Sequence, residues 1–146
     1  MYKRQILTDA NEEFPDRLET IYDRLSEITR TYKPDAASVE KLYFQNNHKT
    51  AIDVAQARGT ILLALKKLNT PIYEYTPLQV KTAVTGYGRA QKSQIMMMTQ
   101  RLLRLREIPK PDDAADALAI AICHINSLGF QYINEKQKLT KLIMRI

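Results

Sequence analysis

The chain has 146 residues, 45% of them hydrophobic and 26% charged, and lysine plus arginine outnumber aspartate plus glutamate by 22 to 16, giving a net charge of +6. This size and composition are typical of one soluble globular domain, so we expect residues 1–146 to form a single domain. The one cysteine, Cys123, excludes an intramolecular disulfide and a cysteine-based zinc site, and no apolar run approaches the roughly 18 residues of a membrane span.

The first predicted element is the end of a strand, and a long helix follows it. Residues 6–8 (ILT) are a short apolar run that predicts a strand end, and residues 9–13 are polar and predict a loop. From Pro15 to Tyr32 apolar residues recur at three- and four-residue spacing, which is typical of an amphipathic helix. Pro34 ends that helix because proline cannot continue it.

A strand, a loop and a second long helix come next. Residues 36–40 (AASVE) predict a short buried strand with Glu40 at its end. Residues 41–48 are a polar loop that carries two aromatic side chains. The apolar pattern over residues 50–68 then predicts the longest apolar-faced helix of the chain.

The pattern of strand followed by helix repeats in the next segment. Residues 71–75 (PIYEY) predict a strand, and residues 76–77 (TP) are a cap and a first-position proline that begin a short helix ending near Val84. Residues 86–88 (GYG) break this helix, and residues 91–105 predict another. The side chains expected to face inward on this last helix are Ile95, Met98, Leu102 and Leu105.

The last predicted helix has an acidic start and precedes a basic tail. Residues 111–121 (PDDAADALAIA) place a proline and then an aspartate where a helix begins, and the aspartate can accept the unpaired N–H groups of the first turn. The tail over about residues 130–146 carries more lysine and arginine than glutamate. Strands and helices thus alternate from residue 36 onward, which predicts an α/β fold with parallel strands. A parallel sheet needs more than two good strands, so part of the sheet is missing at the front.

Three carboxylates are candidates for metal-dependent chemistry. Glu40 ends an apolar strand, at the edge of the sheet where α/β proteins place their ligands. Asp113 and Asp116 share one face of a helix rich in alanine, and their mutual repulsion favours a divalent cation such as Mg²⁺ between them. The alternatives are a solvated strand end for Glu40 and an acidic first turn that complements the helix dipole for the aspartates. Converging carboxylates that hold Mg²⁺ would point to phosphodiester hydrolysis.

Cations and aromatic residues near two loops are candidates for nucleic-acid binding. Lys81, Arg89 and Lys92 lie around the glycine-containing turn, where they could contact backbone phosphates or remain ordinary solvated side chains. Tyr43 and Phe44 follow Glu40 and could stack on an unpaired base, or one of them could pack in the core.

Five motifs, in order and at family spacing, resemble RuvC, the family of Holliday-junction resolvases. They lie at residues 39–44 (VEKLYF), 55–59 (AQARG), 74–75 (EY), 80–92 (VKTAVTGYGRAQK) and 113–119 (DAADALA). The resemblance covers about residues 6–125. It implies a ribonuclease H-like α/β fold with a mixed sheet flanked by helices. It also implies a crossover junction endodeoxyribonuclease that resolves four-way DNA junctions in recombination and repair.

The resemblance also assigns roles to individual residues and partners. Glu40, Asp113 and Asp116 correspond to three of the four acids that hold Mg²⁺, two ions in a complete site. Tyr43 corresponds to an aromatic near the junction centre, and Lys81 and Lys92 correspond to lysines that face DNA. The implied partners are junction DNA, a second copy of the chain through residues 50–68, and the branch-migration proteins RuvA and RuvB.

The chain departs from the family at its start, and this leaves alternatives open. It contains no G-I-D-P-G motif of the first strand, so the first strands look missing and the chain looks truncated at its amino terminus. We therefore expect the chain as given not to cut junctions, for lack of the first-strand aspartate. The alternatives are a junction-binding protein without catalysis and a small α/β domain with an interaction role. The absence of a signal-peptide pattern and the lone cysteine predict a cytoplasmic location without membrane contact.

Overall fold

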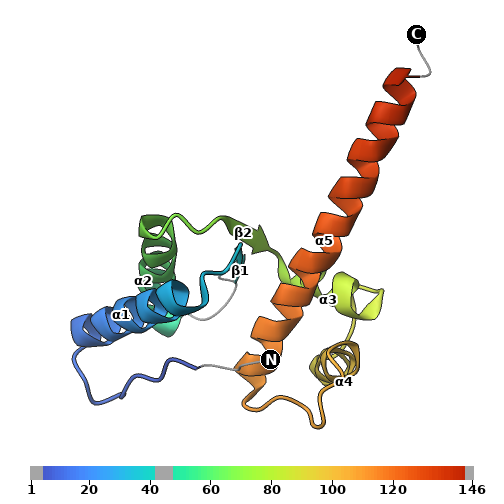
Figure 1. Cartoon of the computed structure of the whole chain (residues 1–146). Coiled ribbons are helices and arrows are strands. Elements are labelled where there is room, and N and C mark those ends of the chain that lie inside the picture. Colours follow the sequence, from blue (N-terminus) through green and yellow to red (C-terminus); the bar gives the residue numbers. More distant parts are fainter. Residues whose placement is uncertain (1–4, 42–47, 144–146) are drawn as a thin grey trace. The chain divides into compact units, whose positions relative to one another are not determined.

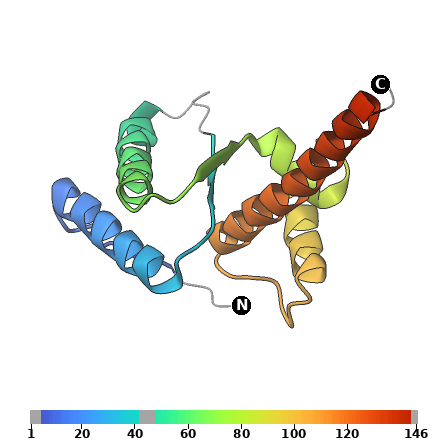
Figure 2. The same ribbon diagram turned by 45° about the horizontal axis from the view of Figure 1, so that its top comes forward.

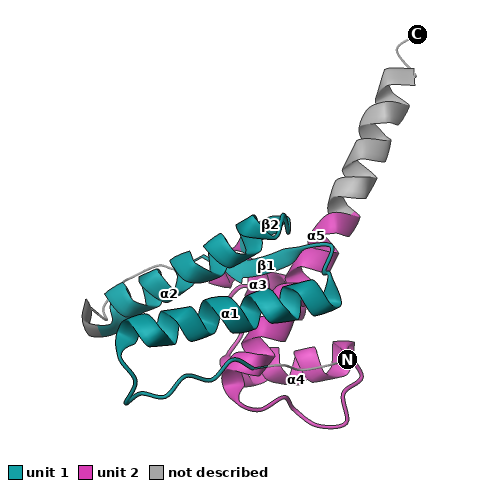
Figure 3. Ribbon diagram, turned by 60° about the vertical axis from the view of Figure 1, so that its left-hand side comes forward, with its two compact units in different colours: residues 1–74 teal, residues 75–146 magenta. Residues whose placement is uncertain are grey.

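The computed structural model describes residues 5–41 and 48–143, with side chains for residues 5–41 and 50–129. It divides into two compact units, Met1–Glu74 and Tyr75–Ile146, which are described separately here (Figure 3). The elements in chain order are α1 (Phe14–Tyr32), β1 (Ala37–Glu40), α2 (His48–Lys67), β2 (Ile72–Tyr75), α3 (Pro77–Thr85), α4 (Lys92–Leu102) and α5 (Asp112–Ile143) (Figure 1).

The first unit is built from two long helices, and α1 packs along α2 (Figures 1 and 2). Proline stands in the first turn of α1, where its missing N–H costs nothing. The helix ends at Lys33, which has a left-handed φ of 45° and donates its backbone N–H to the carbonyl of Thr29 over 2.9 Å. The expected helix and its end before Pro34 are therefore confirmed.

The sheet of the described residues has two strands, and they run parallel. β1 and β2 are neighbours, and the N–H of Ala37 donates to the carbonyl of Pro71 over 2.8 Å, so both strands start on the same side. Because parallel neighbours need a long crossover, α2 occupies the connection between them. The α/β alternation expected from residue 36 onward is confirmed, and Glu40 stands at the carboxyl edge as expected.

The second unit packs α3, α4 and α5 against one another. Thr76 and Gln79 form a capping box at the start of α3, and Gly86 ends that helix with a φ of 86°. The expected cap, proline start and glycine stop are therefore confirmed. The buried core of this unit consists of Tyr75, Val80, Val84, Ala90, Ile95, Ala119, Ile122 and Cys123.

Four expectations about elements need correction. Residues 6–8 form no strand, and Leu7 is 81% exposed, because they pair with no neighbouring strand among the described residues. β1 is half-buried rather than buried. α4 ends at Leu102 and not at residue 105, because the backbone turns at Arg104, where φ is 51°. Leu102 is 49% exposed and does not face inward as expected. α5 continues as a helix to Ile143, through the segment that was expected as a tail.

No helix among the described residues combines the length and the apolar character that crossing a membrane would require.

Candidate functional site

The start of α5 carries three aspartates that are exposed or half-buried, and it buries Ala114, Ala115 and Ala119. Ala115 and Ala119 are fully buried, and such small side chains allow α5 to approach α3 and α4 closely. Asp112 and Asp113 are exposed and Asp116 is half-buried. The positive end of the helix dipole favours carboxylates in this turn. The packing of the alanines therefore presents the acids away from the core of this unit.

Lys92, the first residue of α4, contacts two of these aspartates. Its Nζ lies 3.3 Å from Oδ2 of Asp112 and 3.4 Å from Oδ2 of Asp116. The two aspartates are four positions apart and therefore neighbours on the helix surface. The contact with Asp112 is the main cause that raises the pKa of Lys92, and Asp116 acts in the same direction. Lys92 thus places a positive charge beside Asp116, which is one of the candidate metal ligands.

Asp113 is exposed and forms no ion pair with any described residue. The expected pairing of Asp113 with Asp116 on one face is compatible with this arrangement, since residues three apart are also neighbours on a helix. The carboxylate that shares a cation with Asp116 is nevertheless that of Asp112. Sequence reasoning assigned Asp112 only to the helix start, although its spacing from Asp116 was a signal for a shared partner.

Glu40 stands at the end of β1, where Arg58 of α2 contacts its main chain. The Nε of Arg58 donates to the backbone carbonyl of Glu40 over 3.3 Å, and its Nη2 forms an ion pair with Oε1 of Glu74 in β2. One side chain therefore joins α2 to the ends of both strands. Arg58 and Glu74 were quoted as parts of motifs, but sequence reasoning gave them no role. The signal was one charged residue in each of two motifs, residues 55–59 and residues 74–75.

The turn that carries the candidate DNA-binding cations is braced by hydrogen bonds. The hydroxyl of Tyr87 donates to Oε1 of Gln94 over 2.7 Å, and the hydroxyl of Thr85 donates to the carbonyl of Tyr87 over 3.0 Å. Arg89 is exposed and Lys81 is half-buried, and neither forms an ion pair in the part of the chain that the structure describes. Their charges are therefore available to a ligand. Tyr43 and Phe44 lie outside the described residues.

Two residues of α5 beyond the acidic turn belong to the core. His124 is 8% exposed, and its Nδ1 lies 2.8 Å from the hydroxyl of Tyr75. Cys123 is 2% exposed, and burial raises the pKa of its thiol. Both serve packing in this unit, as expected for Cys123.

The candidate metal ligands fit a hard divalent cation by their chemistry. Glu40, Asp113 and Asp116 offer only carboxylate oxygens, the ligand type of Mg²⁺. A metal bound at Asp116 would compete with the ammonium of Lys92, which lies 3.4 Å from Oδ2 of that residue. Within the described part of either unit, no three acidic, histidine or cysteine side chains lie close enough to hold a metal. Glu40 belongs to the first unit and the aspartates to the second, so their convergence stays a prediction.

Comparison with known proteins gives consistent matches. A family model described as crossover junction endodeoxyribonuclease RuvC matches residues 2–124. RuvC of Fusobacterium nucleatum is 56% identical over 124 residues, which are 85% of this chain and 65% of that protein. RuvC of Brevibacillus brevis is 53% identical over 133 residues, which are 91% of this chain and 80% of that protein. The chain thus spans just under two thirds of the first relative and more of the second.

Solved structures agree with the sequence matches. The structure of Thermus thermophilus RuvC aligns with a TM-score of 0.79 at 35% identity, over 85% of this chain and 75% of that one. T. thermophilus RuvC in complex with a Holliday junction substrate aligns with a TM-score of 0.80 at 35% identity, over 84% of this chain and 74% of that one. The expected ribonuclease H-like α/β fold is therefore confirmed. With the family model covering residues 2–124 and relatives more than half identical, the chain belongs to the RuvC family of crossover junction endodeoxyribonucleases.

Proposed function

We propose that the chain functions as a structure-selective endonuclease that cuts four-way DNA junctions by metal-dependent phosphodiester hydrolysis. The observation that carries the proposal is the family match over residues 2–124. The alignment with T. thermophilus RuvC bound to a Holliday junction supports the choice of substrate. The presence of all three candidate acids at motif positions supports the choice of reaction.

Glu40, Asp113 and Asp116 are the residues that would hold Mg²⁺, with two ions in a complete site. Bound there, the metal would supply an activated water and stabilise the leaving oxygen. The exposed position of Asp113 and the half-buried position of Asp116 leave both carboxylates accessible from solvent. The oxygen-only donor set supports magnesium over softer metals.

Lys81, Arg89 and Lys92 grip the phosphate backbone near the acidic site in this proposal. Lys81 and Arg89 form no ion pair with described residues, so a phosphate would not have to displace an internal partner. Lys92 differs, because Asp112 and Asp116 hold its ammonium beside the candidate ligands. It is thus placed to offset the charge of a phosphate that approaches the carboxylates. Tyr43 is assigned to base stacking by the resemblance alone.

A homodimer with two sites would cut two strands of one junction. The helix α2 supports this assembly, since Ile52 is 67% and Leu63 is 56% exposed. These residues are eleven apart, about three turns, and so lie on one face of the helix. A cytoplasmic location and cooperation with RuvA and RuvB complete the proposal.

A junction-binding protein without catalysis is the second candidate function. It needs only phosphate contacts, and it is favoured by Lys81 and Arg89, whose charges form no ion pair with described residues. Binding and cutting therefore need separate measurements.

The test compares the 146-residue chain with a version extended by a family-like amino terminus. Junction binding, measured in Ca²⁺, should exceed binding to linear duplex and should weaken steeply with salt, because phosphate contacts release counterions. The extended chain should nick junctions in Mg²⁺, and Glu40→Gln or Asp113→Asn should abolish nicking while binding remains. Equal affinity for junction and duplex would contradict the proposal. Binding by the extended chain without nicking would favour the second candidate.

A further inference from the structure

Arg58 is tied to both strand ends of the first unit, one of which carries a candidate catalytic acid. Its Nε donates to the carbonyl of Glu40 over 3.3 Å, and its Nη2 pairs with Oε1 of Glu74. Three elements therefore meet at one guanidinium: α2, β1 and β2. Arginine suits this task because its planar fork presents several donors at fixed angles.

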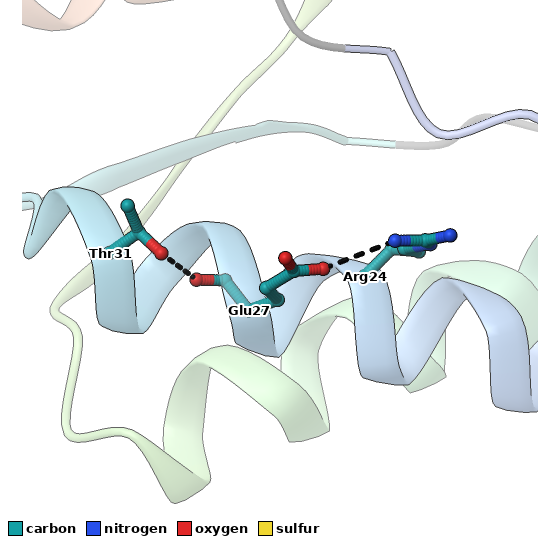
Figure 4. A network of polar contacts seen from close by, with 3 residues as sticks. All are labelled: Arg24, Glu27 and Thr31. Carbon is teal, nitrogen blue, oxygen red and sulfur yellow. Dashed lines mark hydrogen bonds and ion pairs between the residues drawn. The ribbon is translucent and has the colours of Figure 1, made fainter.

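The surroundings of the Arg58–Glu74 pair distinguish it from an ordinary surface ion pair. The side chain of Arg58 is 24% exposed and that of Glu74 is 37% exposed. In the other Arg–Glu pair, Arg24 and Glu27 are 67% and 66% exposed along the surface of α1 (Figure 4). Water screens an exposed pair strongly and a partly buried pair much less, so the Arg58 pair holds its geometry more firmly.

The contact with Glu40 is made to the main chain, and this matters for the side chain. A hydrogen bond to the carbonyl fixes the peptide plane that follows Glu40 and thus restricts the last residue of β1. The direction of its Cα–Cβ bond follows from that backbone geometry. Because Arg58 is occupied by two internal acceptors, it is less suited to gripping phosphate than Lys81 or Arg89.

We propose that Arg58, braced by Glu74, is a positioning residue that fixes the end of β1 and thereby aims the Glu40 carboxylate at the metal site. The inference rests on the proposed function, because that function gives the direction of Glu40 its importance. Arg58 touches neither substrate nor metal in this role. It acts on the reaction through Glu40.

The main test variant is Arg58→Lys, which keeps the charge and loses the fork. A lysine can still pair with Glu74, but one ammonium cannot reproduce the two divergent contacts. We expect affinity for Mn²⁺, measured by electron paramagnetic resonance, to fall several-fold, and Mg²⁺-dependent nicking by the extended chain to fall about 10- to 100-fold, as for a displaced reacting group. Junction affinity in Ca²⁺ and its salt dependence should stay unchanged. Glu74→Gln should give a smaller loss of the same kind, since the bond to Glu40 remains.

Matched controls and a double variant separate positioning from other roles. Arg24→Lys and Glu27→Gln make the same changes in the exposed pair and should alter none of these measurements. In a Glu40→Gln background, Arg58→Lys should cause no further loss of Mn²⁺ affinity, because both changes act through the same carboxylate. The amide resonance of Lys41 reports directly on the Glu40 carbonyl, since both belong to one peptide bond. It should shift in Arg58→Lys and stay in place in Arg24→Lys.

Several outcomes would overturn the inference. A fall in junction affinity with a smaller salt slope would make Arg58 a DNA contact. If Arg58→Lys lowers Mn²⁺ affinity equally with and without the Glu40 carboxylate, then Arg58 does not act through Glu40. If Arg58→Lys lowers thermal stability but leaves Mn²⁺ affinity unchanged, then the contacts of Arg58 are merely structural. If the unmodified chain itself shows no junction preference, the proposed function fails. In that case the Lys41 amide resonance still tests the contact between Arg58 and Glu40. An unchanged resonance in Arg58→Lys would contradict that contact, and a shifted resonance would support it.

Discussion

In the proposed function Lys92 has two tasks, the binding of phosphate and the balance of acidic charge. Its ammonium lies within 3.4 Å of carboxylate oxygens from both Asp112 and Asp116, yet its side chain is 52% exposed. Such an exposed group adds little to folding stability, because water screens its ion pairs. Its value lies in where it places a positive charge, beside the acids on which the proposed chemistry depends.

The first prediction concerns the pKa of Lys92. Asp112→Asn should lower this pKa towards the usual lysine value, because the hydrogen bond to Asp112 is the largest cause of its rise. A raised pKa means that the ion pairs contribute stability below the unfolded-state pKa and lose it as the pH rises through the folded value, in the strongly alkaline range. A pH titration followed by ¹⁵N NMR of the lysine ammonium measures the shift. Asp16→Asn, in the first turn of α1, should leave Lys92 unchanged, and an equal shift there would contradict the assignment.

The second prediction concerns the buried pair of Tyr75 and His124. Tyr75→Phe removes a hydrogen bond of 2.8 Å and deprives a buried ring nitrogen of this partner. We expect the free energy of unfolding to fall by about 0.5–1.5 kcal/mol, the usual net contribution of one hydrogen bond. Urea denaturation measures the change. Tyr87→Phe removes an exposed bond to Gln94 and should cost clearly less. Equal losses in the two variants would show that burial does not set the cost.

At the scale of elements, two glycines differ in their backbone conformation, since one ends a helix with a positive φ and the other lies within a helix. Gly86 ends α3 with a φ of 86°, a conformation that side chains with a Cβ rarely adopt. Gly59 lies inside α2, and a Cβ added there would meet no atom within 4 Å. The end of α3 therefore requires glycine, whereas the glycine within α2 lowers the stability of that helix.

The third prediction follows from this contrast. Gly86→Ala should lower the free energy of unfolding by about 1 kcal/mol or more, because alanine pays for the left-handed conformation. Gly59→Ala should raise it by about 0.5–1 kcal/mol, because alanine favours the helix and restricts the unfolded chain. Thermal unfolding of both variants checks the two signs. If Gly59→Ala instead lowers the stability, then the added methyl group meets an atom that is not among the described residues.

At the scale of the whole molecule, the proposed function requires the basic chain to bring an acidic site to a polyanion. The net charge of +6 favours DNA at long range, while the acids at the start of α5 repel phosphate at short range. Lys92 reduces that repulsion locally. A dimer would bring two basic chains and two acidic sites to one junction, and assembly is therefore part of the proposed function.

The fourth prediction tests that assembly. Leu63→Glu puts a charge on the exposed apolar face of α2 and should shift the extended chain from dimer to monomer, because a charge buried in an interface is costly. Sedimentation equilibrium measures the change. Leu78→Glu, at a residue of α3 that is 62% exposed, is the matched control and should leave the dimer intact. If the extended chain without the substitution is a monomer, or if its dimer persists in Leu63→Glu, then this face of α2 is not the dimer contact.

The resemblance of motifs was sufficient for the family, and local chemistry was sufficient for most element types and several boundaries. The cap at Thr76, the proline after it and the stop at Gly86 act within one or two turns, so each could be predicted from its neighbours. The end of α1 before Pro34 follows from the same kind of local constraint. The acids were found as residue types at motif positions. Their convergence on one metal, and the role of Tyr43, stay predictions.

Tertiary structure decided the contacts between residues far apart in the chain. Lys92 meets Asp112 because α4 packs on α5, and Arg58 meets Glu40 because α2 crosses between two parallel strands. The local pattern of each segment can mark a charged residue, but it does not identify the distant residue that becomes its partner. The same reason explains the failed strand at residues 6–8, because an apolar run becomes a strand only where another strand accepts its hydrogen bonds. Sequence thus determined which groups the chain carries, and packing determined which of them act together.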